Sequence, residues 1–438
     1  MSLISGLEIG RRSLNAYKSA ITITGHNISN VENPNYTRQK PDLEPSMPRS
    51  GIPSGVDLET VSRQRDRFAD LKYREQAALL GKWDVQTGYL EQVEGIVGAD
   101  GEGSLTDLMN RFWNSWHDLA NSPESNATRI SLVQSALALT DKLNEISSSL
   151  SSIRSVLNDT IEDKVSRVND LLEEVAELNV KIASLIRDGG NPSDLQDRRE
   201  MALDELSRLA SIGYSEKGDG TVSVRIGGVT LVEGANSSAI ELQKGSNGNL
   251  IPTLAGNSLQ ISSGEIGGLI EFRDKLDGMI GRINEMAGSL VRKVNELHSS
   301  GYGLDGSSGI PFFSGESASD ITVNPDLVDA PEKVAAAGQP DSPGDNSIAL
   351  AIARLRDQFD KYHASTVALI GSQTAQAERE AENNEILLRQ IETYRQGEFG
   401  VSLDEELTNL IRFQRAYQAA AKFVASIDEL LQSLINMK

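Results

Sequence analysis

A long apolar seam at the C-terminus constrains the fold of this chain more than any other feature. Apolar residues recur there at alternating steps of three and four, at Leu410, Phe413, Tyr417, Ala420, Val424, Ile427, Leu431 and Leu434. This unbroken series is close to the repeat of about 3.5 residues that is typical of a helix lying along other helices. The sequence therefore predicts a C-terminal assembly helix within residues 399–438.

The N-terminus carries a second, less regular seam. Its apolar positions are spaced seven residues apart, at Leu7, Leu14, Ile21 and Ile28. Gly10 and Thr24 interrupt the line of residues beside it. Neither terminal helix has an apolar core of its own to pack on, and isolated helices are marginal in water. We therefore expect the ends to lie with each other in a nested architecture, to fray in the isolated chain, and to become ordered when a partner covers their seams.

The composition of the 438-residue chain narrows the classes of function. A hydrophobic fraction of 38% permits a sizeable core and about two to four domains. The net charge of -21 argues against a nucleic-acid partner, because phosphate binding needs a basic surface. The absence of cysteine excludes disulfides and thiolate chemistry. No apolar run approaches the about 18 residues of a membrane-spanning helix, so no membrane insertion is expected.

Changes in periodicity divide the chain into nested parts. Val222, Val224 and Ile226 alternate before Gly227-Gly228, which is a β-hairpin signal, whereas helical periodicity dominates elsewhere. The predicted fold class is mainly α, with long helical-bundle and coiled-coil terminal regions and a small inserted β domain. The predicted parts are an N-terminal assembly helix and linker (1–60), a helical bundle in two segments (61–209 and 267–398), the β domain (210–266), a glycine-rich loop within the second segment (299–345), and the C-terminal assembly helix (399–438).

Asn179 is the one polar residue on an otherwise apolar helical seam, between Val175 and Ile182. A buried asparagine at such a position fixes register at some cost in stability. The alternative is that Asn179 turns to a solvent edge, and the spacing favours neither reading.

None of the polar motifs predicts an active site. Residues 301–306 (GYGLDG) match a dinucleotide-binding pattern, but a predicted helix precedes them and turn residues follow, so we expect a loop. The four histidines lie far apart and form no pair at helical spacing, which leaves no predicted metal site. Asp404, Glu405 and Glu406 fit a helix start, where acidic residues are favourable. We therefore predict no catalytic residue, no cofactor and no enzymatic activity.

Motifs at both ends resemble those of the bacterial flagellar rod, hook and hook-associated proteins. Residues 27–39 (NISNVENPNYTRQ) join the first helix to a turn, and residues 401–419 are similar to the other half of the family pattern. The family usually has glycine at position 35; because asparagine also tolerates a left-handed backbone, the turn is expected to survive. The turn motif consists of Asn30, Pro34, Asn35, Tyr36 and Arg38.

Segments in the middle of the chain narrow the resemblance to the hook-associated members. These segments are residues 121–124, 195–199, 266–273 and 295–313. The region before the last long helix is short, which implies that an outer domain of larger members is reduced or missing.

The resemblance implies an extracellular structural subunit, exported unfolded through the flagellar type III apparatus, at the junction of hook and filament. Its implied partners are copies of itself, the flagellar hook protein, the second hook-associated junction protein and a cytoplasmic export chaperone that holds the C-terminal helix. The seam residues of both ends are the expected assembly interface. The alternatives are the second hook–filament junction protein or another axial subunit, a cytoplasmic coiled-coil scaffold, and an enzyme built on a coiled-coil scaffold.

Overall fold

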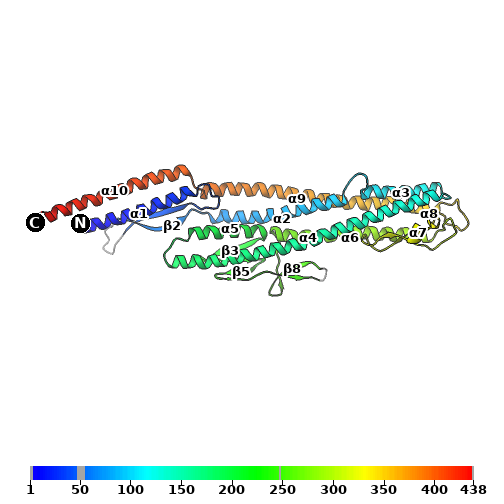
Figure 1. Cartoon of the computed structure of the whole chain (residues 1–438), viewed down its shortest axis with the longest axis horizontal. Helices are drawn as coiled ribbons and strands as arrows, with labels where there is room; N and C mark the ends of the chain where they lie inside the picture. Colours follow the sequence, from blue (N-terminus) through cyan, green and yellow to red (C-terminus); the bar gives the residue numbers. More distant parts are fainter. Residues whose placement is uncertain (1–2, 47–54, 246–247, 437–438) are drawn as a thin grey trace.

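The computed structural model describes residues 3–46, 55–245 and 248–436 and has the form of a long rod (Figure 1). Its main helices are α1 (Leu3–Ser29), α2 (Arg67–Val97), α3 (Leu105–Asn121), α4 (Asn126–Arg187), α5 (Ser193–Leu209), α6 (Gly264–Ser299), α9 (Arg356–Phe399) and α10 (Leu403–Asn436). Shorter helical pieces are α7 (Pro325–Asp329), the 3-10 helix η1 (Pro331–Lys333) and α8 (Ser347–Ala353). No described helix combines the length and the apolar character that a membrane span requires.

The strands form small antiparallel sheets. The first is the hairpin of β1 (Gln39–Pro45) and β2 (Val56–Arg63), and the last pairs β10 (Phe313–Ser314) with β11 (Thr322–Val323). Between them, β3 (Ile212–Glu216), β4 (Val222–Ile226), β5 (Val229–Glu233) and β6 (Asn236–Ser237) form one sheet, and β7 (Glu241–Lys244), β8 (Leu250–Leu254) and β9 (Asn257–Ser258) form another. The prediction of a mainly α fold with a small β insert is confirmed.

Side-chain caps fix where the helices of the bundle begin. The carboxylate of Asp66 accepts a hydrogen bond from the amide of Phe68, and the hydroxyl of Ser104 accepts one from the amide of Asp107 at 3.1 Å. These caps satisfy amide groups that have no partner inside the helix. The 62-residue α4 then runs along most of the rod, and Gly189, with φ of 74°, follows its end.

The predicted linker after the first helix contains more structure than expected. β1 and β2 pair across a register that includes Gln39 opposite Arg63, and the hairpin packs on α1. Both backbone polar groups of Gln39 are bound by the side chain of Asn27 on α1, at 3.0 Å and 2.9 Å. The predicted linker therefore includes strands in this part of the chain, because the side chain of Asn27 on α1 anchors the first of them.

The hairpin predicted at Gly227-Gly228 is confirmed. β4 and β5 are antiparallel, and both glycines have positive φ, as a two-residue turn of the favoured hand requires. Asn179 holds this sheet against α4, because its side-chain amide donates to the carbonyl of Val222 at 2.8 Å and its oxygen accepts from the amide of Val222 at 2.9 Å. Asn179 is fully buried, so the buried alternative is the correct one.

The turn between β8 and β9 offers a stabilising substitution. Ala255 and Gly256 connect Leu254 to its partner Asn257, and Ala255 has φ of 48°. A left-handed backbone costs an ordinary residue roughly 1 kcal/mol, and asparagine tolerates it better. We expect Ala255→Asn to raise the free energy of unfolding by about 0.5–1 kcal/mol, measured by urea denaturation. An equal or lower stability than that of the wild type would contradict this reading of the turn.

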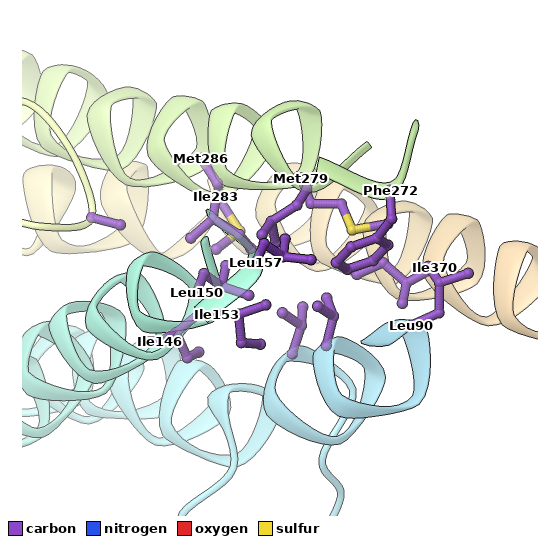
Figure 2. Packing of buried hydrophobic residues seen from close by; sticks show 14 of the residues in the cluster. Leu90, Ile146, Leu150, Ile153, Leu157, Phe272, Met279, Ile283, Met286 and Ile370 are labelled. Carbon is purple, nitrogen blue, oxygen red and sulfur yellow. The ribbon is translucent and has the colours of Figure 1, made fainter. Parts of the chain in front are cut away.

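The apolar core lies mainly within the helical bundle, which extends to the distal end of the rod, opposite the two chain ends (Figure 1). Figure 2 shows Leu90 of α2, Leu150 and Leu157 of α4, Phe272 of α6 and Ile370 of α9 packed together. Toward the far end the core becomes aromatic and includes Phe112, Trp113, Trp116, Phe312 and Phe313.

The segment predicted as a glycine-rich loop is tied to the bundle by side chains of the helices. Asn295 of α6 binds the backbone of Phe313 through both its donor and its acceptor, at 2.8 Å each. Arg129 of α4 is buried and donates to the carbonyls of Pro123, Ser125 and Val334. This segment therefore caps the distal end of the rod, and its GYGLDG sequence makes turns, as expected.

Candidate assembly site at the paired chain ends

α1 and α10 lie side by side in antiparallel directions at one end of the rod, beyond the bundle (Figure 1). Two glycines of α1 let the helices approach closely. A β-carbon on Gly6 would lie 2.6 Å from Cδ1 of Ile427, and one on Gly10 would overlap Cγ2 of Val424. Farther along α1, Ala20 and Thr24 are buried. The N-terminal helix thus uses small residues to receive the larger side chains of α10.

The predicted C-terminal seam faces this contact. Phe413 and Ile427 are buried at 6% exposure each, and Val424 meets Gly10. Tyr417 is 38% exposed, and the remaining described members, Leu410, Ala420 and Leu431, are half-buried. The side chain of Leu434 lies outside the described residues. The expectation that ends lie with ends is confirmed.

The predicted N-terminal seam does not form the centre of the contact. Leu7, Leu14, Ile21 and Ile28 are all half-buried, beside the row of small residues that faces α10. The expectation that the seams find cover only in a partner is therefore wrong. Gly10 and Thr24, which interrupt the apolar pattern, are at the contact because close approach of two helices requires small side chains.

Large apolar residues remain exposed on α10 after this pairing. Leu430 is 56% exposed and Ile411 is 51% exposed. We call the members of this set outside the seam the open residues of α10, and they are Leu403, Leu407, Ile411, Phe423, Leu430 and Ile435. Since most of these side chains are already about half covered, burying the remaining surface of each would contribute about 1 kcal/mol. A soluble surface rarely retains such a concentration of apolar side chains along one helix without an interaction to cover it.

A buried carboxylate locks the N-terminal motif to the start of α10. Glu406 is only 2% exposed, and its two oxygens accept hydrogen bonds from Nδ2 of Asn27 at 2.9 Å and Nε of Arg38 at 2.8 Å. Arg38 also pairs with Glu405 at 2.6 Å. Hydrogen bonds between ionised groups are roughly twice as strong as neutral ones, and one buried carboxylate here joins both ends of the chain. Glu405 and Glu406 therefore do more than favour a helix start.

The turn motif docks on the bundle. The hydroxyl of Tyr36 donates to Oδ1 of Asn27 at 2.8 Å, and the amide of Arg38 donates to the carbonyl of Phe399 at 3.1 Å. The side chain of Asn30 bonds back to the carbonyl of His26 at 3.0 Å. Pro34 is exposed at the tip of the turn.

Asn35 makes the turn without the left-handed backbone that the resemblance suggests. Its φ is not positive, and its amide donates instead to the side-chain oxygen of Asn33 at 3.2 Å. An asparagine side chain that accepts such a bond imitates a backbone turn. The turn therefore survives without glycine, but for this different reason.

Among the residues that the structure describes, no group of three histidine, aspartate or glutamate residues is placed to hold a metal ion. Of the histidines, His298 and His363 are buried, and His298 is bound by backbone groups through both ring nitrogens. Burial lowers the pKa of His298 to about 4. These are the properties of a histidine that stabilises a core.

Comparisons with known proteins agree with this geometry. A family model described as the flagellar hook-associated protein FlgK helical domain matches residues 90–313, and one described as the flagellar basal body rod FlgEFG protein C-terminal matches residues 398–437. Flagellar hook-associated protein 1 of Bacillus subtilis is 30% identical over 99% of this chain and 98% of its own length. The protein of the same name from Escherichia coli is 22% identical over the whole of both chains.

A solved structure is similar in fold. The flagellar hook junction protein FlgK of Burkholderia pseudomallei matches with a TM-score of 0.51 and 23% identity, covering 56% of this chain and 46% of its own.

A helical rod with paired ends and this turn motif is thus an axial structural protein of the bacterial flagellum. The model of the helical domain spans half of the chain and the relative from B. subtilis nearly all of it. The chain belongs to the family of flagellar hook-associated protein 1.

Proposed function

We propose that this protein is a structural subunit that joins hook to filament in the flagellum. The observation that carries the proposal is the set of open residues of α10, which the intramolecular partner α1 leaves uncovered. The names of the relatives from B. subtilis and E. coli support the hook association, and the name of the solved relative supports the junction.

The two faces of α10 have different proposed roles. The seam around Phe413, Val424 and Ile427 pairs with α1 inside one chain, and the open residues of α10 contact neighbouring subunits. The half-buried row of α1 that contains Leu7 and Ile28 adds to this outer interface. The turn motif directs the chain out of the terminal helix pair, since its Arg38 binds α10 and the neighbouring Thr37 binds α5.

The partners proposed for these surfaces are copies of this chain, the hook protein and the second hook-associated junction protein. Before assembly, an export chaperone would cover the open residues of α10, which a soluble protein must shield from aggregation. The subunit would work outside the cell, after type III export, and without enzymatic activity. The polar residues at the ends support a mechanical role, since Asn27, Arg38 and Glu406 are all engaged in joining helices to each other.

The test is a charged substitution of the open residues. Leu407→Asp combined with Ile411→Asp places two carboxylates where neighbours would bury apolar surface, and burying an unpaired charge costs several kcal/mol. We expect a folded, soluble monomer with unchanged circular dichroism, but cells carrying only this variant should lose filaments from their hooks. Val424→Asp is less specific, because Val424 packs on Gly10 within the chain.

The matched control is Val156→Asp on α4, at an apolar residue of similar exposure in the bundle. It should leave filament attachment intact. Normal filaments with the Leu407→Asp, Ile411→Asp variant would refute the assignment of this surface to assembly.

A further inference from the structure

The apolar core stops before it reaches the paired ends. Its members and the partly buried residues packed on it lie between Trp83 and Ala377, and no described residue of α1, β1, β2 or α10 belongs to it. In the first turns of α2, between Arg67 and Gly81, the buried residues are Ala69, Asp70, Arg74, Ala77, Ala78 and Gly81. No apolar side chain of α2 larger than alanine is buried there. Phe399 at the end of α9 is buried beside the joint, but it is not part of the apolar core, so that core does not join the ends to the bundle.

A group of buried ion pairs occupies this place instead. Arg74 of α2 is 2% exposed and binds Asp204 at 2.7 Å and Glu200 at 2.5 Å, both on α5. Arg395 of α9 binds Asp204 at 2.9 Å and also Asp70 at 3.0 Å. Arg74 thus binds two carboxylates of α5, and Arg395 binds one carboxylate of α5 and one of α2.

Two further arginines bring the N-terminal connection into the same group. Arg65 binds Asp70 at 2.5 Å, and Arg63, at the end of β2, binds Asp197 at 2.6 Å. We call the whole set the charge node, which consists of Arg63, Arg65, Arg74, Arg395, Asp70, Asp197, Glu200 and Asp204. It contains four cations and four anions, so its charges balance. Burial alone would raise the pKa of Glu200, but Arg74 and Arg65 outweigh it and hold the pKa at about 2.

Both connections between the ends and the bundle pass through the charge node. On the N-terminal side, the amide of Thr37 donates to Oδ2 of Asp197 at 3.0 Å, directly before Arg38 reaches α10. On the C-terminal side, Arg395 lies one turn before the end of α9 at Phe399. Any change in the angle between the α1–α10 pair and the bundle must therefore move residues of the charge node.

We infer that the charge node fixes the angle between the α1–α10 pair and the helical bundle, acting as a polar lock in a place where no apolar core holds the two parts. Arginine–carboxylate pairs are directional, so they define an orientation and not merely a proximity. Removing one partner leaves an uncompensated buried charge and is more disruptive than losing a surface pair. A substitution in the charge node can therefore free the angle between the α1–α10 pair and the bundle while both parts stay folded. This inference goes beyond the junction role and does not depend on it.

The absence of cysteine makes a distance measurement straightforward. Spin labels at Gln418→Cys on α10 and Ser184→Cys on α4 report the angle, because both positions are exposed and belong to different parts. Labels at Ser184→Cys and Ser372→Cys on α9 report the bundle alone. Pulsed dipolar spectroscopy on the soluble monomer gives the distribution of each distance.

Arg395→Gln and Asp204→Asn each neutralise one member of the charge node. We expect the 418–184 distribution to be narrow in the wild type and at least about twice as wide in both variants, with the 184–372 distribution unchanged. Glu385→Gln on α9 is the matched control, since Glu385 forms an ion pair with exposed Arg389 one turn along the same helix, outside the charge node, and it should change neither distribution.

A milder variant keeps the inference testable if neutralisation unfolds the bundle. Arg395→Lys retains the charge but replaces the rigid guanidinium, whose Nη2 contacts both Asp70 and Asp204, by a flexible ammonium, so it should widen the 418–184 distribution alone. A wide distribution in the wild type, or widths unaltered by all three node variants, would overturn the inference. Since no assembly is involved, this result is independent of the filament test.

Discussion

Replacing Gly10 by valine is expected to separate the two terminal helices of this protein. A side chain at position 10 has no space, because its first carbon would already overlap Val424. Valine is stiff in a helix and cannot turn aside, so α10 must move away from α1. Overpacking of this kind costs about 1–3 kcal/mol, and the separation would also expose Phe413 and Ile427. Limited proteolysis should cleave α10 of the variant much faster than that of the wild type, while the bundle resists.

Gly25 provides the matched control within the same helix. No atom lies within 4 Å of a β-carbon built there, so Gly25→Val should leave the proteolysis rate of α10 unchanged. Adding Val424→Ala to the Gly10→Val variant removes the opposing methyl groups and should recover part of the protection. Equal rates for Gly10→Val and Gly25→Val would mean that close helix approach does not hold the ends together.

The helices and the inserted hairpin of this chain follow from local patterns. Ser104 caps α3 as its position before a helical apolar series predicts, and Gly227-Gly228 makes the expected turn. These features were predictable because each depends on residues that lie within a few positions of one another. The apolar spacing of α10 likewise identifies the face that is buried, since Phe413 and Ile427 both lie on it.

The partner of that face could not be predicted from apolar spacing. A search for large apolar residues treats Gly10 as an interruption, whereas the structure places it where Val424 packs. The signal available was the four-residue spacing of Gly6 and Gly10, which puts two small residues on one face of α1 and permits close helix contact.

The polar contacts of the site could not be predicted from the sequence for a different reason. Glu406 and Arg38 are 368 residues apart in the chain, and the acids at the start of α10 have a sufficient local explanation. The charge node has the same character, because Asp70, Glu200 and Arg395 come from three helices. Only the tertiary fold brings such residues together, and no spacing rule describes them.

Mild acid is expected to destabilise the distal end of the rod through buried histidine, and His298 gives the larger effect. Its ring is buried against Trp116 and Phe312, and burial lowers its pKa to about 4, from about 6.5 in an unfolded chain. Nε2 accepts a hydrogen bond from the amide of Ala335 at 2.9 Å, so a proton on this nitrogen would also break that bond. The neutral ring is therefore the form that the folded state binds.

The sign of the pH dependence follows from this depressed pKa. Above pH 6.5 the ring is neutral in both states and the stabilisation is fully present; as the pH falls toward 4, the unfolded chain gains a proton that the folded chain does not. The contribution of His298 to the free energy of unfolding should decrease by about 2 kcal/mol between pH 7 and pH 5, and by about 3 kcal/mol once the pH is below both values.

Urea denaturation of the wild type and of His298→Gln at pH 7 and pH 5 isolates this contribution, because glutamine does not titrate and the carboxylates are common to both proteins. The variant should be less stable at pH 7 but should lose about 2 kcal/mol less on acidification. His117→Gln, on the exposed face of α3 next to the same aromatic cluster, should instead follow the wild type at both pH values. If the wild type and His298→Gln lost equal stability between pH 7 and pH 5, the buried ring would not be kept neutral by the fold.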